Sequence, residues 1–204
     1  MPGAKSGATT RGARFAGKVG GLSPGLRARM VGASWHPDPR CPAFESLALV
    51  TVSHWDLAGA ARTGQLIVAQ PLAAEILEIF AGLFDLGFPI ERMDPIDRFG
   101  GNDDASMAAN NTSAFNFRNV AGTNVLSKHA LGAAIDINPR LNPMIIGAQI
   151  FPPAGAAYLD RSVAQPGMIL RPGPVVDLFD ARGWEWGGDW SPMKDYHHFT
   201  KAGA

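Results

Sequence analysis

Seven prolines fall between Pro139 and Pro174, and this segment shows little hydrophobic periodicity. Proline lacks a backbone donor and interrupts both helices and inner strands. A segment of this length without regular structure is unusual in a compact domain, and it often forms the wall or lid of a functional site. We therefore expect a long irregular segment near an active site.

Regular elements are predicted before this segment. Residues 45–55 alternate and are rich in β-branched and aromatic residues, which is typical of a strand, and residues 65–69 predict a second strand. Pro71 opens a helix in which apolar residues recur at three- and four-residue spacing, and Gly87 ends it. The pattern of the helix indicates ordinary core packing.

Residues 113–120 alternate again. Phe115 and Phe117 share one face of the predicted strand, so Arg118 points to the opposite side. A further strand and a short helix are expected at residues 134–138 and 175–183. Together these patterns predict an α+β fold with a small central antiparallel sheet, flanking helices and the irregular segment near the active site.

The chain has 204 residues, of which 46% are hydrophobic and 18% charged, enough for one sizeable core. We expect the domain to span residues 35–204. Residues 1–34 hold six basic and no acidic side chains, against 12 basic and 18 acidic in the remainder. Their Gly, Ala and Ser content without periodicity predicts a disordered segment; the alternative is a head that favours an anionic surface.

Several protein classes are excluded by the composition. The N-terminal segment lacks the apolar core of a secretory signal, and no apolar run approaches the ~20 residues that span a membrane. Cys41 is the single cysteine, so an internal disulfide and a cysteine-based zinc site are excluded. A structural role of this thiol is favoured over a catalytic one.

The stretch SKHALGAAID, residues 127–136, offers a histidine and a carboxylate seven residues apart. In a straight helix His129 and Asp136 would lie about 10 Å apart along the axis, and in a straight strand they would lie on opposite faces. The chain must therefore turn between them to bring both to one metal ion, and Gly132 is available for that turn.

The stretch DYHHFT, residues 195–200, contains two adjacent histidines. Neighbouring residues of an extended chain point to opposite faces, so His197 and His198 are not expected to bind the same ion. An acid three residues before a ligand histidine can lie on the same side of a turn, and Asp195 has this relation to His198. The spacing favours His198 as a metal ligand, Asp195 as general base, and a His197 that faces away or lines the substrate cleft.

These segments resemble a known family, the zinc D-Ala-D-Ala carboxypeptidases and L-Ala-D-Glu endopeptidases that cut peptidoglycan stem peptides and share the Hedgehog/DD-peptidase fold. Its pattern SxHxxGxAxD is met by Ser127, His129, Gly132, Ala134 and Asp136. Its acid-x-x-His element is met by Asp195 and His198. The block GWEWGGDW, residues 183–190, is similar to that of the endolysin-like branch, and NTSAFNFR, residues 111–118, resembles the stretch with the substrate-contacting arginine.

The resemblance implies one zinc ion held by His129, Asp136 and His198. It implies Asp195 as the base that moves protons, and Arg118 as the group that stabilises the scissile carbonyl or binds a substrate carboxylate. It also implies a substrate contact by Ser127. Trp186 and Trp190 offer rings that can pack on a glycan or stem peptide, with Trp190 the expected substrate contact, and the alternative for at least one of them is packing in the core.

The implied partners are peptidoglycan stem peptides, with no nucleic acid and no membrane span, and the protein is expected to be a monomer. Many relatives carry Glu where Asp195 stands, which shortens the reach of the base here. The alternative interpretation is a catalytically inactive module of the same fold that binds cell wall. The sequence leaves open which stem-peptide bond is cut, and whether the protein reaches the wall by a non-classical route or stays inside the cell until lysis.

Overall fold

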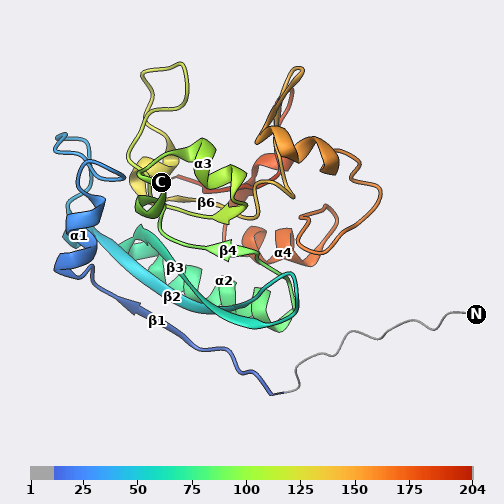
Figure 1. Cartoon of the computed structure of the whole chain (residues 1–204), viewed down its shortest axis with the longest axis horizontal. Helices are drawn as coiled ribbons and strands as arrows, with labels where there is room; N and C mark the ends of the chain where they lie inside the picture. The colour runs from blue at the N-terminus through green and yellow to red at the C-terminus, as the bar shows by residue number, and fades with distance from the viewer. Residues whose placement is uncertain (1–11, 204) are drawn as a thin grey trace, which may run out of the picture.

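The structure is a computed structural model and describes residues 12–203 (Figure 1). The helices are α1 (Pro24–Met30), α2 (Ala73–Asp85), α3 (Asp103–Ala108) and α4 (Pro174–Asp180). The strands are β1 (Gly17–Gly20), β2 (Leu47–Trp55), β3 (Ala61–Ala69), β4 (Arg92–Met93), β5 (Asn111–Thr112), β6 (Ala134–Asp136), β7 (Met144–Ile146), β8 (Gln149–Phe151), β9 (Trp184–Trp186), β10 (Lys194–Asp195) and β11 (His198–Lys201). Among the described residues, no helix combines the length and apolar character that crossing a membrane requires.

A long antiparallel ribbon of β2 and β3 forms the base of the fold, with β1 on the outer side of β2. Both faces of this ribbon are covered. Val50 and Val52 of β2 belong to the main core cluster with Ile79 and Phe80 of α2, and Figure 1 shows α2 running along the ribbon. Burial of each such side chain contributes roughly 1.5–3 kcal/mol, so the predicted helix is fixed by its apolar face.

The opposite face of the ribbon packs against a second core cluster. There Leu47 and Ile67 meet Leu26 and Met30 of α1, together with Phe115. Residues 1–34 were expected to be disordered. For the described part this expectation is wrong, because β1 pairs with β2 and α1 buries two apolar side chains. The first eleven residues lie outside the described part of the chain.

A second sheet carries the C-terminal half of the core, in the order β6-β11-β9. Phe199 of β11 is fully buried and stacks on Phe179 of α4, with ring centroids 3.8 Å apart. Two smaller sheets complete the strands, β10-β7-β8 and the parallel pair β4-β5. The predicted α+β class is confirmed, but the strands form several small sheets where one central sheet was expected.

The segment from Pro139 to Pro174 is less irregular than expected. It contains the hairpin β7–β8 and a 3-10 helix at Pro153–Tyr158, and the remainder has no regular structure. Backbone pairing of β7 with β10 joins this segment to the strand that carries Asp195. Strands β7 and β8 have only three residues each, so no hydrophobic period can be recognised in their sequences.

The segment around Phe115 and Phe117 alternates as expected, although it is extended chain rather than a strand of a sheet. Both phenylalanines are buried, and their backbone nitrogens donate to the carbonyl oxygens of Ile67 and Ser34. Arg118, next along the chain, is therefore held on the side away from this core cluster. This side faces α3, as its ion pair with Asp103 shows.

Candidate metal centre

His129 lies in a 3-10 turn, Lys128–Leu131, whose beginning and end are both fixed locally. The Ser127 hydroxyl accepts a hydrogen bond from the His129 backbone nitrogen at 3.2 Å. Gly132 ends the turn with a φ of +67°, in the left-handed region that favours glycine. Its backbone lies so close to β3 that an added Cβ would sit 2.5 Å from the Ala69 nitrogen. The turn that the sequence required between His129 and Asp136 is thus built by Gly132.

The ring orientation of His129 is set by a backbone carbonyl. Its Nδ1 lies 2.6 Å from the carbonyl oxygen of Ala114. Because a carbonyl oxygen only accepts, Nδ1 carries the donated proton, and Nε2 is the nitrogen turned toward Asp136 and His198. Such a hydrogen bond on the far nitrogen is the usual way in which proteins orient a metal-binding imidazole.

Asp136 and His198 are brought together by strand pairing. β6 and β11 are antiparallel, and Asp136 lies directly opposite His198 in their register. Side chains of directly opposed residues lie on the same face of a sheet. The Nδ1 atom of His198 is 2.9 Å from Oδ1 of Asp136. The indole ring of Trp190 packs beside His198, with ring centroids 5.4 Å apart.

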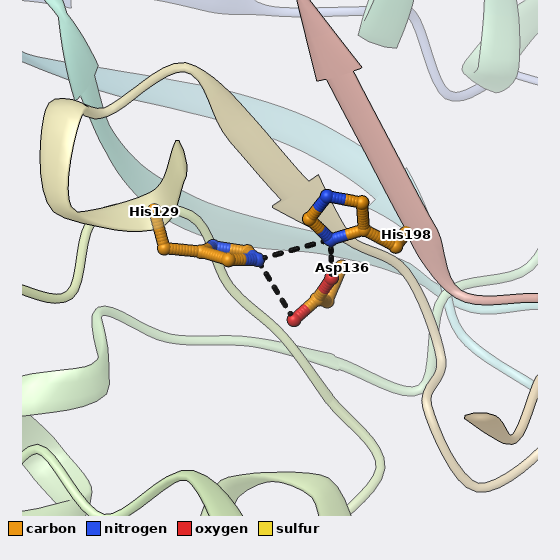
Figure 2. A group of neighbouring side chains, drawn as sticks. All are labelled: His129, Asp136 and His198. Carbon is orange, nitrogen blue, oxygen red and sulfur yellow. Dashed lines mark hydrogen bonds and ion pairs between the residues drawn. The ribbon is translucent and has the colours of Figure 1, made fainter. Parts of the chain in front are cut away.

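The three side chains converge on one point (Figure 2). Their candidate ligand atoms all lie within 4.8 Å of one another. His129 Nε2 is 3.2 Å from both Asp136 Oδ2 and His198 Nδ1. Zinc binds nitrogen and carboxylate oxygen at about 2.0–2.2 Å in tetrahedral geometry, so two of its ligand atoms are roughly 3.3 Å apart. Two imidazoles and one carboxylate at these separations fit the donor set of a catalytic zinc site.

The charges in the cluster favour a cation. Burial by itself would raise the pKa of Asp136, but the charges of His129 and His197 and hydrogen bonds from the histidines hold it well below its usual value. Burial also disfavours the charged form of His129, and the charge of Arg118 acts in the same direction. The Asp136 carboxylate outweighs both and raises the pKa of the His129 ring above its usual value. A metal ion bound here would replace the proton, because coordination requires the neutral imidazole.

Asp195 lies beside this cluster, at the end of β10. Its side chain is buried, and Oδ1 is 3.0 Å from Nε2 of His197. The same nitrogen of His197 is 3.9 Å from Oδ1 of Asp136. One imidazole therefore stands between the candidate base and a candidate ligand.

His197 does not face away from the site, and the sequence-based expectation is wrong on this point. Its ring is 3% exposed, so it does not line an open cleft either. Its Nδ1 donates to the carbonyl oxygen of Asn142 at 2.8 Å. Burial disfavours the charged ring, but the carboxylates of Asp195 and Asp136 raise the pKa of His197 to about 9. The alternation of an extended chain fails here because residues 196 and 197 form the turn between β10 and β11.

The remaining predicted site residues lie in three different surroundings. Ser127 is buried and its hydroxyl caps the His129 turn. Arg118 is half-buried and forms an ion pair with Asp103 of α3. Trp190 packs beside His198, whereas Trp186 is buried in the main core cluster.

Three contributions to the site lay beyond the sequence-based reasoning. These are the Ala114 carbonyl on His129, the Asn142 carbonyl on His197 and the Asp103 carboxylate on Arg118. Two of them are backbone carbonyl oxygens, which every residue type has, so the sequence does not indicate them. Asp103 is the first residue of α3, and the polar sequence around it does not distinguish it from its neighbour Asp104.

Comparison with known proteins links the stretch that holds the candidate metal centre to a peptidase family. Residues 121–201 match the family model described as D-alanyl-D-alanine carboxypeptidase, and this match confirms the predicted family resemblance. The matched stretch is less than half of the chain. It contains His129, Asp136, Asp195 and His198, but Arg118 and Asp103 precede it. Neither the curated proteins nor the solved structures gave a match to this chain.

Proposed function

We propose that the protein is a zinc peptidase of the Hedgehog/DD-peptidase fold that hydrolyses amide bonds in peptidoglycan stem peptides. The observation that carries the proposal is the convergence of His129 Nε2, His198 Nδ1 and the Asp136 carboxylate on one point. The family match over the same residues supports the substrate class. The activity is of one of two types, a D-alanyl-D-alanine carboxypeptidase or an L-alanyl-D-glutamate endopeptidase.

Zinc bound here by three protein ligands would supply a Lewis acid and lower the pKa of a coordinated water toward ~7. Three protein ligands leave one position for that water, as catalytic zinc sites require. The ligand set of two neutral imidazoles and one carboxylate is that of well-known zinc peptidases. The buried surroundings of the cluster strengthen the interaction of each ligand with a cation.

Asp195 would act as the general base. It takes a proton as water attacks the carbonyl carbon, and it then gives this proton to the leaving amine. Its Oδ1 lies 3.0 Å from Nε2 of His197, and we assign proton transfer to Oδ2. Arg118 supplies a positive charge for the developing oxyanion or for a substrate carboxylate. In the first role, one such donor typically contributes about 10²–10³ in rate.

The test is hydrolysis of purified cell walls and of synthetic stem peptides by zinc-loaded and chelator-treated protein. We expect release of new amino groups or of D-alanine only with zinc, and restored release when zinc is added back. Pentapeptides ending in D-Ala-D-Ala and tripeptides with the L-Ala-D-Glu bond distinguish the two activities. If zinc-loaded protein binds walls but releases no product, the peptidase proposal fails and the wall-binding module is supported.

A further inference from the structure

Arg118 is held by one edge of its guanidinium group. Its Nε forms an ion pair with Oδ2 of Asp103, and Nη1 makes only a long contact of 3.4 Å with the Asn119 carbonyl oxygen. The Arg118 side chain is 34% exposed to solvent. A guanidinium group offers donors along two edges. The edge that carries the two terminal nitrogens is therefore the one left for another acceptor.

Asp103 is itself held in place. It is the first residue of α3, and its Oδ1 accepts a hydrogen bond from the side-chain amide of Asn116 at 2.8 Å. Asn116 is buried, and the same amide donates to the Gly101 carbonyl oxygen at 3.1 Å. One carboxylate oxygen of Asp103 is thus fixed by a buried neutral amide, while the other faces Arg118.

The same asparagine is tied to the candidate metal centre. The backbone nitrogen of Asn116 donates to the carbonyl oxygen of His129 at 3.1 Å. A continuous set of contacts therefore runs from the His129 turn through Asn116 and Asp103 to the guanidinium group.

We propose that Asp103 is a positioning residue, which fixes the Nε edge of Arg118 and thereby presents the terminal nitrogens to an anionic group of the substrate. This inference rests on the proposed function. The anionic group is either a carboxylate of the stem peptide or the oxyanion that forms on the scissile carbonyl. Arginine is suited to both, because its planar fork pairs with two oxygens at once.

The test compares Asp103→Asn with Asp104→Asn. The Asp103→Asn substitution keeps the size of the side chain and an oxygen that can accept from Asn116, but it removes the charge that holds Arg118. Asp104 is exposed and lies in the same first turn of α3, so its substitution changes the charge of that turn equally. We expect kcat/KM on a stem peptide to fall about tenfold to a hundredfold in Asp103→Asn, because a misplaced group can cost ~10² in rate. Asp104→Asn should stay within about twofold of wild type.

The same measurement identifies the substrate group. A rise in KM assigns Arg118 to a substrate carboxylate, and a fall in kcat assigns it to the oxyanion. A double variant then separates positioning from general stability. If Asp103 acts through Arg118, adding Asp103→Asn to Arg118→Ala produces no further loss, and zinc content and thermal unfolding stay as in Arg118→Ala alone.

Binding of the stem peptide to the zinc-loaded protein, measured by calorimetry, gives a readout that does not depend on turnover. Weaker binding in Asp103→Asn than in Asp104→Asn supports the inference even where wild-type protein hydrolyses nothing and the peptidase proposal has failed. Equal kcat/KM and equal binding in Asp103→Asn and wild type overturn it. A loss of the same size in the Arg118→Ala background also overturns it.

Discussion

The Nε2 atom of His197 lies 3.0 Å from Oδ1 of Asp195, and the His197 ring is buried. The other ring nitrogen is fixed by the Asn142 carbonyl oxygen. Adjacent histidines in the sequence therefore have different surroundings. His198 turns to Asp136 and His129, whereas His197 turns to the candidate base.

Replacement of Asp195 separates metal binding from proton transfer. In Asp195→Asn we expect zinc to remain bound in a one-to-one ratio, because Asp195 is not among the three converging ligands. Turnover should fall by about 10²–10⁴, the usual contribution of a general base. Zinc content by elemental analysis and hydrolysis of a stem peptide check this. Loss of zinc together with activity would instead make Asp195 a ligand.

Replacement of His197 should affect turnover more than metal binding, since its ring is closer to Asp195 than to Asp136. For His197→Leu, which keeps an apolar side chain in the buried space, we expect kcat to fall about tenfold or more. Zinc affinity, measured by competition with a chromogenic chelator, should change by a smaller factor. An unchanged kcat would show that the contact with Asp195 has no role in the reaction.

Removal of a ligand should abolish tight zinc binding. His129→Ala, Asp136→Ala and His198→Ala each leave two of the three converging ligands. Equilibrium dialysis should show at least about a hundredfold weaker zinc binding for each variant. His36→Ala, at a histidine outside the cluster, is the control and should bind zinc as wild type does. A ligand variant that keeps full affinity would remove that residue from the metal centre.

Gly132→Ala tests the turn that brings His129 to Asp136. The added methyl group would meet the Ala69 nitrogen at 2.5 Å, and the φ of +67° disfavours alanine. We expect a loss of about 1–3 kcal/mol in the free energy of unfolding, together with weaker zinc binding. Gly122→Ala is a matched control, since its φ is +73° but no atom lies within 4 Å of the added methyl group. Equal losses in the two variants would contradict the steric argument.

His54 should make stability depend on pH. Burial lowers its pKa below the usual 6.5, although the Trp55 and Ile90 carbonyls oppose this. The unfolded chain then takes up a proton at higher pH than the folded protein does. The contribution of His54 to stability is therefore complete above pH ~6.5 and is lost as pH falls through the folded-state pKa. Denaturant unfolding at several pH values should show a smaller fall on acidification for His54→Gln than for wild type.

Local patterns predicted the parts of the fold whose burial is periodic. β2 and α2 follow from alternation and from three- and four-residue spacing, and Gly132 follows from the distance between His129 and Asp136. β1 was missed because each of its residues is exposed and only pairing with β2 defines it. α1 was missed because its seven residues contribute only Leu26 and Met30 to the core.

At the candidate site, residue types and spacing predicted the three converging ligands. They did not predict the contacts that hold the neighbouring side chains in place. The contact of His197 with Asp195 depends on a turn whose geometry is not encoded by alternation. The contact of Asp103 with Arg118 joins residues fifteen positions apart through a loop and a helix, and no local pattern relates them.

The pairing of β6 with β11 has a consequence for insertions and deletions in this protein. Asp136 faces His198 in this pairing, while the next residue, Phe199, fills the core against Phe179. A shift of one position would exchange the two faces of the strand and move a ligand and a core ring at once. Changes of length should therefore be confined to the loops, such as residues 120–125 and 160–166, and be absent from residues 134–136 and 198–200.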